Sequence, residues 1–87
     1  MTKLKEIVNE FNSLYMDKTG KSQGLVAPRS RNGDGSIMLF DLDSMEVIGN
    51  AVHFKTEEEA IDFITNLSLL TILGKADQIK TLFKGGH

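Results

Sequence analysis

The stretch at residues 36–42, SIMLFDL, constrains the fold more than any other part of this chain. Its alternating positions form two sets, and both are apolar: Ile37 with Leu39, and Met38 with Phe40 and Leu42. A strand that is apolar on both sides has to be covered on both sides. A chain of 87 residues has barely enough material to cover one face of a small sheet. The sequence therefore raises the question of what covers the second face.

Composition places the chain in the ordinary globular class. Its apolar content is 40%, its charged content is 25% and it has one proline, which argues against disorder. Typical domains have about 100 to 150 residues, so we expect residues 1–87 to form a single domain. Cysteine is absent, which excludes disulfides and thiolate metal sites.

The chain opens directly into an amphipathic pattern instead of a secretory leader, so we expect a cytoplasmic protein. Its most apolar stretch, residues 67–73, is far shorter than the roughly 20 residues that a membrane helix needs. We therefore expect no contact with a membrane.

Charge is spread unevenly along the chain, although the net charge is only −2. Residues 1–31 carry six Lys and Arg against three Asp and Glu, residues 32–67 carry one against eight, and residues 68–87 carry three against one. The middle of the chain is acidic and its ends are mildly basic. This is not the concentrated basic footprint with which nucleic-acid-binding proteins neutralise phosphates.

Helices are expected on both sides of a central group of strands. Residues 3–18 carry apolar side chains at the spacing of one helix face, with Thr2 as N-cap and Gly20 as stop. The sequence Thr56-Glu57-Glu58-Glu59 is a capping box, so a second helix should start at Glu57 and run to about residue 67. Residues 69–83 support one more helical segment, with Gly74 as a break.

Strands and turns occupy the middle of the chain. Residues 24–30 read as a strand, and Pro28 places that strand at a sheet edge because proline cannot donate to the ladder. Asn-Gly and Asp-Gly within residues 31–35 predict a hairpin. The central strand, a turn and a third strand follow at residues 36–42, 43–46 and 47–54. The predicted fold class is α+β: a helix, a three-stranded antiparallel meander, then two C-terminal helices.

The meander brings charged groups together at its ends. Its first loop lies at the same end as Phe54, so we expect Arg29 and Arg31 beside the three glutamates that begin the second helix. Two interpretations stay open: a surface salt bridge worth roughly 0 to 1 kcal/mol, or the polar rim of a contact site. A second acidic group, formed by Asp41, Asp43 and Glu46, lies at the opposite end of the sheet, about 25 Å from these glutamates. The two acidic groups therefore cannot form one metal or acid/base site.

The faces of the sheet carry the functional hypothesis. We expect Met38, Phe40 and Leu42 to pack beneath the helices with Ile48, Val52 and Phe54. The other face then holds Ile37, Leu39, Val47, Gly49, Ala51 and His53. Contiguous apolar patches larger than a few hundred Å² usually bind something. The alternative is that the C-terminal segment folds across this face and completes the core.

Familiar chemistries find little support in the residues. Ser30, Asn32, Asp34 and Gly35, followed by Asp41, partly match the spacing of an EF-hand loop, but a proline-containing strand precedes them, so we interpret them as a hairpin turn. The chain has two histidines, His53 and His87, and neither has a motif around it. The glycines lead into a strand and lack the lysine of a phosphate-binding loop. We expect no enzymatic activity, no cofactor and no metal.

The order of elements resembles that of the double-stranded-RNA-binding domain in topology alone. That domain begins its second helix with lysines, whereas this chain has glutamates there, which would repel phosphates. Nucleic-acid binding remains the alternative function, through Lys3, Lys5, Lys18, Arg29 and Arg31.

Our main functional hypothesis is a small non-enzymatic module that binds another protein, or itself as a homodimer, and so regulates it. The candidate binding residues are Arg29, Arg31, Ile37, Leu39, Val47 and His53. In its size and lack of motifs the chain resembles the accessory proteins of bacteriophages and mobile elements that inhibit a host protein, a resemblance of general character alone.

Overall fold

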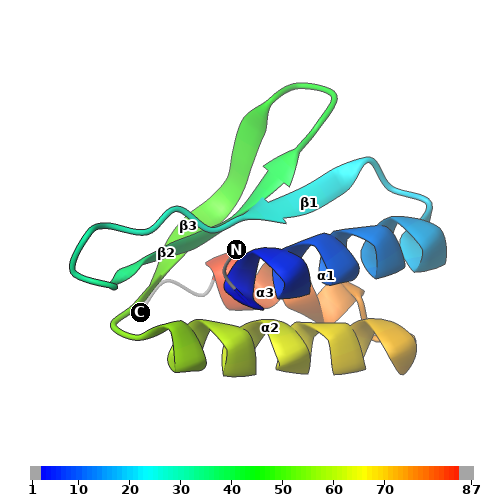
Figure 1. The fold of residues 1–87 in the computed structure, drawn as a ribbon. Coiled ribbons are helices and arrows are strands. Elements are labelled where there is room, and N and C mark those ends of the chain that lie inside the picture. Colours follow the sequence, from blue (N-terminus) through cyan, green and yellow to red (C-terminus); the bar gives the residue numbers. More distant parts are fainter. Residues whose placement is uncertain (1–2, 85–87) are drawn as a thin grey trace.

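The computed structural model describes residues 3–84, which fold as a helix, three strands and two further helices (Figure 1). The elements are α1 (Lys3–Thr19), β1 (Gln23–Val26), β2 (Gly35–Asp41), β3 (Glu46–Phe54), α2 (Glu57–Ile72) and α3 (Asp77–Lys84). This order confirms the predicted α+β fold class. The predicted N-cap Thr2 and the second histidine, His87, lie outside the described residues.

Local signals in the sequence set the bounds of the helices. Thr56 caps α2 as predicted: its hydroxyl accepts the Glu59 N–H at 3.2 Å, and Glu59 Oε1 accepts the Thr56 N–H at 3.2 Å. Helix α2 continues to Ile72, further than predicted, and the chain then turns at Gly74, whose φ is 77°. Gly20, with φ of 69°, ends α1 in the left-handed conformation that glycine adopts without steric cost.

The strands form one antiparallel sheet in the order β1-β2-β3. Strand β1 is shorter than predicted and ends at Val26, because Pro28 offers no N–H to continue the ladder. Pairing resumes briefly beyond the proline, where Arg29 and Gly35 form an isolated bridge. The segment with partial EF-hand spacing is therefore the connection of a hairpin, in which the Ser30 hydroxyl bonds the Asp34 carboxylate.

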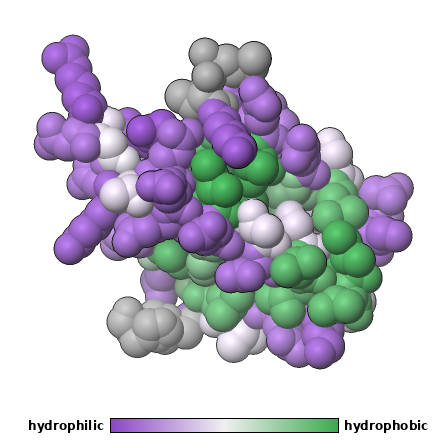
Figure 2. Space-filling model, turned by 60° about the horizontal axis from the view of Figure 1, so that its bottom comes forward, coloured by the Kyte–Doolittle hydropathy of each residue, from purple (hydrophilic) through white to green (hydrophobic). Residues whose placement is uncertain are grey.

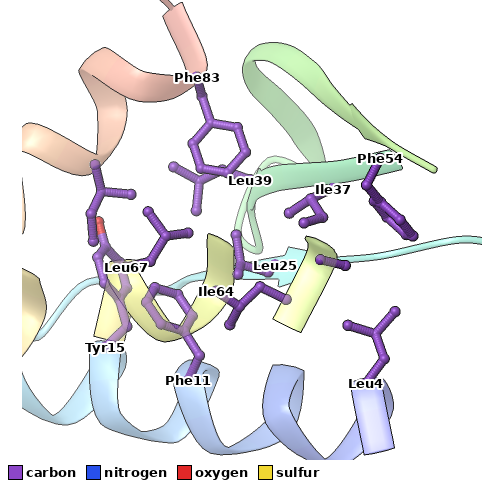
Figure 3. Close-up of a cluster of buried hydrophobic side chains, with 12 residues drawn as sticks. Leu4, Phe11, Tyr15, Leu25, Ile37, Leu39, Phe54, Ile64, Leu67 and Phe83 are labelled. Carbon is purple, nitrogen blue, oxygen red and sulfur yellow. The ribbon is translucent and has the colours of Figure 1, made fainter. Parts of the chain in front are cut away.

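All three helices lie on one face of the sheet, below it in Figure 1, where α1 and α2 run side by side in the same direction. Helix α3 packs against β3 on this inner face, since Ile79 and Phe83 belong to the same buried cluster as the sheet residues Leu25 and Ile37 (Figure 3). The C-terminal helix thus adds to the covered face and leaves the other face of the sheet bare within residues 3–84.

The side chains of β2 that face the helices are not the predicted ones, whereas Ile48, Val52 and Phe54 of β3 pack against the core as predicted. Ile37 and Leu39 are completely buried in the core, whereas Met38 and Phe40 on the opposite face remain partly exposed. The prediction that Ile37 and Leu39 lie on an open face is therefore wrong. Cross-strand pairing gives the reason, because Leu39 pairs with Ile48 and residues directly opposite in a ladder share a face.

An irregularity in β3 gives its middle a separate role. Ile37 pairs with Val52 and Leu39 with Ile48, so residues 49–51 together stand opposite Met38. Gly49 has φ of 78°, and a Cβ atom on it would lie 2.8 Å from the backbone oxygen of Phe83. The irregularity thus lets the end of α3 approach the strand more closely than a residue with a side chain would allow.

Candidate functional site

The bare side of the sheet is apolar at its centre. We define the outer face as the residues of the sheet that point away from the helices, together with the apolar residues of the β2–β3 turn: Val26, Met38, Phe40, Leu42, Met45 and Val47. Register places Val26 beside Met38 and Phe40 beside Val47, so these side chains form adjacent cross-strand pairs. Val47 is 44% exposed and Met45 is 68% exposed. Large apolar side chains that are exposed next to one another are typical of a contact surface.

A polar pair borders the outer face at the end nearer α2. The imidazole Nδ1 of His53 lies 3.1 Å from the Ser36 hydroxyl, and the two residues are direct cross-strand partners. A hydroxyl activated by an imidazole also needs a group that orients the ring. Within the described part of the chain, no acceptor contacts the other nitrogen of His53. The pair therefore fits a hydrogen-bonded edge of a binding surface better than a site in which Ser36 acts as a nucleophile.

One ion pair ties the first hairpin to the start of α2. Arg29 Nη1 lies 3.7 Å from Glu57 Oε1, and both side chains are about 30% exposed. The second carboxylate oxygen of Glu57 accepts the backbone N–H of Leu4 at 2.9 Å. The expectation that Arg29 neighbours the glutamates is thus confirmed for Glu57, whereas Arg31 is exposed and makes no ion pair within residues 3–84.

A cavity of about 610 Å³ opens where β3 leads into α2. Its lining residues are Asp34, Gly35, His53, Phe54, Lys55 and Glu59. The two carboxylates already have structural partners, because Asp34 bonds the Ser30 hydroxyl and Glu59 Oε1 accepts the N–H groups of Lys55 and Thr56. These bonds use one oxygen of each carboxylate, so a ligand would meet both carboxylates as well as His53 and Lys55.

The opposite end of the sheet combines an acidic turn with a lysine cluster, which consists of Lys21, Lys80 and Lys84. Asp41 Oδ1 accepts the backbone N–H groups of Asp43 and Ser44 at 2.9 and 3.2 Å and so closes the β2–β3 turn. In this cluster, the pKa of Lys80 of α3 is lowered, chiefly by the positive charge of Lys21. Nearby Asp41 opposes this shift in the pKa of Lys80, so the cluster is partly neutralised.

A second apolar surface, which the sequence analysis did not identify, lies on the helical side. Leu69, Ile72 and Leu73 near the end of α2 are 51%, 59% and 65% exposed. Figure 2 shows hydrophobic surface gathered at one side of this view. The available signal was the run of apolar residues at 67–73, since consecutive residues of a helix cannot all point to one face.

The predicted binding residues therefore divide into three groups. Val47 and His53 lie on or beside the outer face, as expected. Arg29 and Arg31 lie on the loop that borders its α2 end. Ile37 and Leu39 are in the core and cannot contact a partner in the folded chain. Met38, Phe40 and Val26 take their place.

Other kinds of site find no support in the described residues. Within residues 3–84 no group of three or more His, Asp or Glu side chains is placed to hold a metal ion. None of the helices in that range has the length and apolar character needed to span a bilayer. Comparison of the chain with protein-family models, with curated proteins and with solved structures gives no match.

Proposed function

We propose that this chain is a small non-enzymatic module that binds a polypeptide through the outer face of its sheet and so regulates it. The observation that carries the proposal is that the outer face is apolar while all three helices pack on the inner face. Burial of apolar surface is worth about 25 cal/mol per Å², so covering such a face with a partner is favourable. Polar groups at both ends would fix the orientation of that partner.

The surface has the anatomy of a small protein interface. Val26, Met38, Phe40 and Val47 form an apolar centre, and no Asp, Glu, Lys or Arg stands among them. The charged residues lie at the strand ends, as Asp41 and Glu46 do, or in the loops beyond them, which corresponds to a polar rim. An inhibitor of the kind that mobile elements use against host proteins would need a surface of this type.

Photocrosslinking tests this proposal directly. A photoreactive phenylalanine analogue at Val47 should form crosslinks to a polypeptide in cell extract, because the position points out of the sheet. The same analogue at Thr65, an exposed position on the polar side of α2, should form few. Equal yields at the two positions, or none at either, would contradict binding through the outer face.

Nucleic-acid binding is the second candidate, and the lysine cluster is the observation that favours it. The ammonium groups of Lys21 and Lys84 both repel that of Lys80, and a phosphate beside Lys80 would relieve that repulsion. A gel-shift assay with single- and double-stranded RNA and DNA tests this function. Binding that weakens steeply with salt and disappears in Lys21→Ala/Lys80→Ala would support it, and absence of binding in low salt would remove it.

A further inference from the structure

The β2–β3 turn, residues 42–45, carries the most exposed large apolar side chain among residues 3–84. This side chain is Met45, which is 68% exposed, and those of Leu42 and Val47 beside it are 41% and 44% exposed. In Figure 1 the hairpin that ends in this turn projects away from the three helices. Apolar surface thus continues from the outer face onto a projecting part of the fold, where a partner can reach it from several sides.

The backbone of Met45 has a conformation that methionine disfavours. Its φ is 61°, and among residues 3–84 it is the one residue other than glycine with a positive φ. Glycine and asparagine adopt this region readily, whereas the Cβ of a longer side chain crowds the backbone there. Either residue would therefore suit the turn better if the turn served the fold alone. Residues held in such conformations gather at binding sites, so the strain points to a use for this side chain.

Asp41 holds the turn in place before any partner arrives. Its Oδ1 accepts the backbone N–H groups of Asp43 and Ser44, and its carbonyl oxygen accepts the N–H of Met45 at 2.7 Å. Three successive N–H groups are thus bonded to one residue. A contact segment that is already ordered loses less conformational entropy on binding, so Met45 can act as an anchor.

Two carboxylates accompany the apolar side chains of the turn. Asp43 lies in the turn itself, and Glu46, which pairs with Asp41, lies on the helix side of the hairpin. Both are exposed, and neither forms an ion pair with another residue of the described range. Of the carboxylates at this end of the sheet, it is Asp41 that acts on the pKa of Lys80. Asp43 and Glu46 are therefore available to cations of a partner.

We propose that the β2–β3 turn inserts into an apolar pocket of a different polypeptide whose rim carries lysine or arginine, with Met45 as the anchor. The proposal rests on the function proposed above and adds the position of the central contact and the chemistry of the partner. A pocket encloses an inserted turn, so it meets Leu42 and Val47 on the outer side and Glu46 on the helix side together. Its basic rim pairs with Asp43 and Glu46 and orients the complex.

Site-specific crosslinking with mapping of the products tests the proposal. A diazirine analogue of methionine at position 45 should form crosslinks in cell extract, and mass spectrometry should locate them at apolar residues of the partner that have lysine or arginine close by. The same analogue at position 16 of α1, where Met16 is also exposed, should form few. Added salt should lower the yield from position 45, because exposed charges orient the complex.

Charge reversal tests the rim of the pocket separately. Asp43→Lys and Glu46→Lys should each lower the crosslinking yield from position 45 about threefold, which corresponds to the loss of one exposed ion pair. Glu58→Lys is the matched control, because Glu58 is an exposed carboxylate in the first turn of α2, and it should leave the yield unchanged. Equal yields from all three variants and the parent protein would overturn the basic rim.

A substitution at the anchor separates binding from folding. Met45→Asn should lower the crosslinking yield from an analogue at Val47 at least about fivefold, since the loss of a central anchor costs more than 1 kcal/mol. It should nevertheless unfold at no lower temperature than wild type, because asparagine accepts the positive φ more readily than methionine. A Tm several degrees lower would show that Met45 serves the fold, and an unchanged yield would show that it does not anchor the partner. Either result overturns the proposal.

The outcomes also separate this inference from the function on which it rests. Crosslinks from Val47 without crosslinks from position 45 overturn the turn as anchor, while binding through the outer face stays supported. No crosslinks from either position overturn both. Crosslinks to a second copy of this chain, or to a partner surface without lysine or arginine, overturn the proposed chemistry of the partner.

Discussion

Arg29 and Glu57 meet across 28 residues of sequence through a carboxylate that also serves a third segment. Glu57 Oε1 lies 3.7 Å from Arg29 Nη1, while Glu57 Oε2 accepts the Leu4 N–H at 2.9 Å. Glu57 therefore joins the first hairpin, the start of α1 and the start of α2. The position also favours a negative charge, because the N-terminus of a helix carries partial positive charge.

Glu57→Ala should destabilise the fold more than Arg29→Ala. Loss of Arg29 removes one partly exposed ion pair, worth at most about 1 kcal/mol. Loss of Glu57 also leaves the Leu4 N–H without its acceptor, so we expect a cost of about 1–2 kcal/mol. Urea unfolding measures both. Glu58→Ala is the control, because Glu58 also lies in the first turn of α2 but makes neither of these two contacts. Equal costs for Glu57→Ala and Glu58→Ala would show that the contacts contribute nothing.

Asn12 should prove essential for the edge of β1. Its side chain accepts the Leu25 N–H at 2.7 Å and donates to the Leu25 carbonyl at 3.2 Å, so it replaces a neighbouring strand. Asn12→Ala should cost about 1–3 kcal/mol and should increase aggregation, because both backbone groups lose their partner. Asn9→Ala, at an exposed position of the same helix, should be neutral or slightly stabilising, since alanine has the higher helix propensity. Thermal unfolding with light scattering reports both effects.

Tyr15 should make stability fall at high pH. Its hydroxyl donates to Gln23 Oε1 at 3.0 Å in the core, and burial raises the pKa of Tyr15 above its ordinary value of 10.0. The unfolded chain then loses this proton at lower pH than the folded chain, so stability declines as pH rises above about 10. Tyr15→Phe should cost about 1 kcal/mol at neutral pH, because Gln23 loses its donor.

The pH dependence distinguishes the role of Tyr15 from that of a merely apolar core residue. The difference in unfolding free energy between wild type and Tyr15→Phe should shrink as pH rises from 9 to 11. Taking the difference removes other groups that titrate there, including Lys80, whose lowered pKa acts in the opposite direction. A difference independent of pH would show that the folded environment does not disfavour the ionised phenol.

Gly49 and Gly74 form a matched pair for testing the contact between β3 and α3. Their φ values are 78° and 77°, so alanine should bring similar backbone strain of about 1 kcal/mol at both positions. A new Cβ on Gly49 would also press on the Phe83 backbone, whereas around Gly74 there is no atom within 4 Å. Gly49→Ala should therefore cost a further 1–3 kcal/mol or so and should selectively expose α3 amides to hydrogen exchange. Equal effects of the two substitutions would contradict this close approach.

Much of this fold could be predicted because its signals are local. The capping box at Thr56 and the spacing of apolar residues in α1 depend on near neighbours in the chain, and the structure confirms both. Pro28 correctly indicated an edge strand. For the apolar surface at Leu69 to Leu73, the run at residues 67–73 indicated that some apolar side chains must be exposed, but which of them are exposed depends on tertiary packing.

The two faces of β2 were assigned wrongly because this strand is apolar on both sides, so periodicity could not choose between them, whereas those of β3 were assigned correctly. Turn length carries the missing information. The predicted turn at residues 43–46 already places Leu42 opposite Val47, and the observed ladder pairs Asp41 with Glu46. In the predicted and in the observed register alike, even-numbered residues of β2 lie opposite odd-numbered residues of β3 in this part of the ladder, and odd-numbered residues lie opposite even-numbered ones. Leu39 must then share a face with Ile48, whatever their side chains.

Lysine at two adjacent positions should separate the two faces experimentally. Leu39 is completely buried, so Leu39→Lys places an unpaired ammonium in the core, and the penalty should exceed the few kcal/mol of stability that a small domain has. Met38 is partly exposed on the outer face, so its ammonium can reach water, and Met38→Lys should remain folded. Far-UV circular dichroism and thermal unfolding distinguish these outcomes. If Leu39→Lys folds and Met38→Lys does not, the two faces of β2 are reversed, and the outer face is no longer a binding surface.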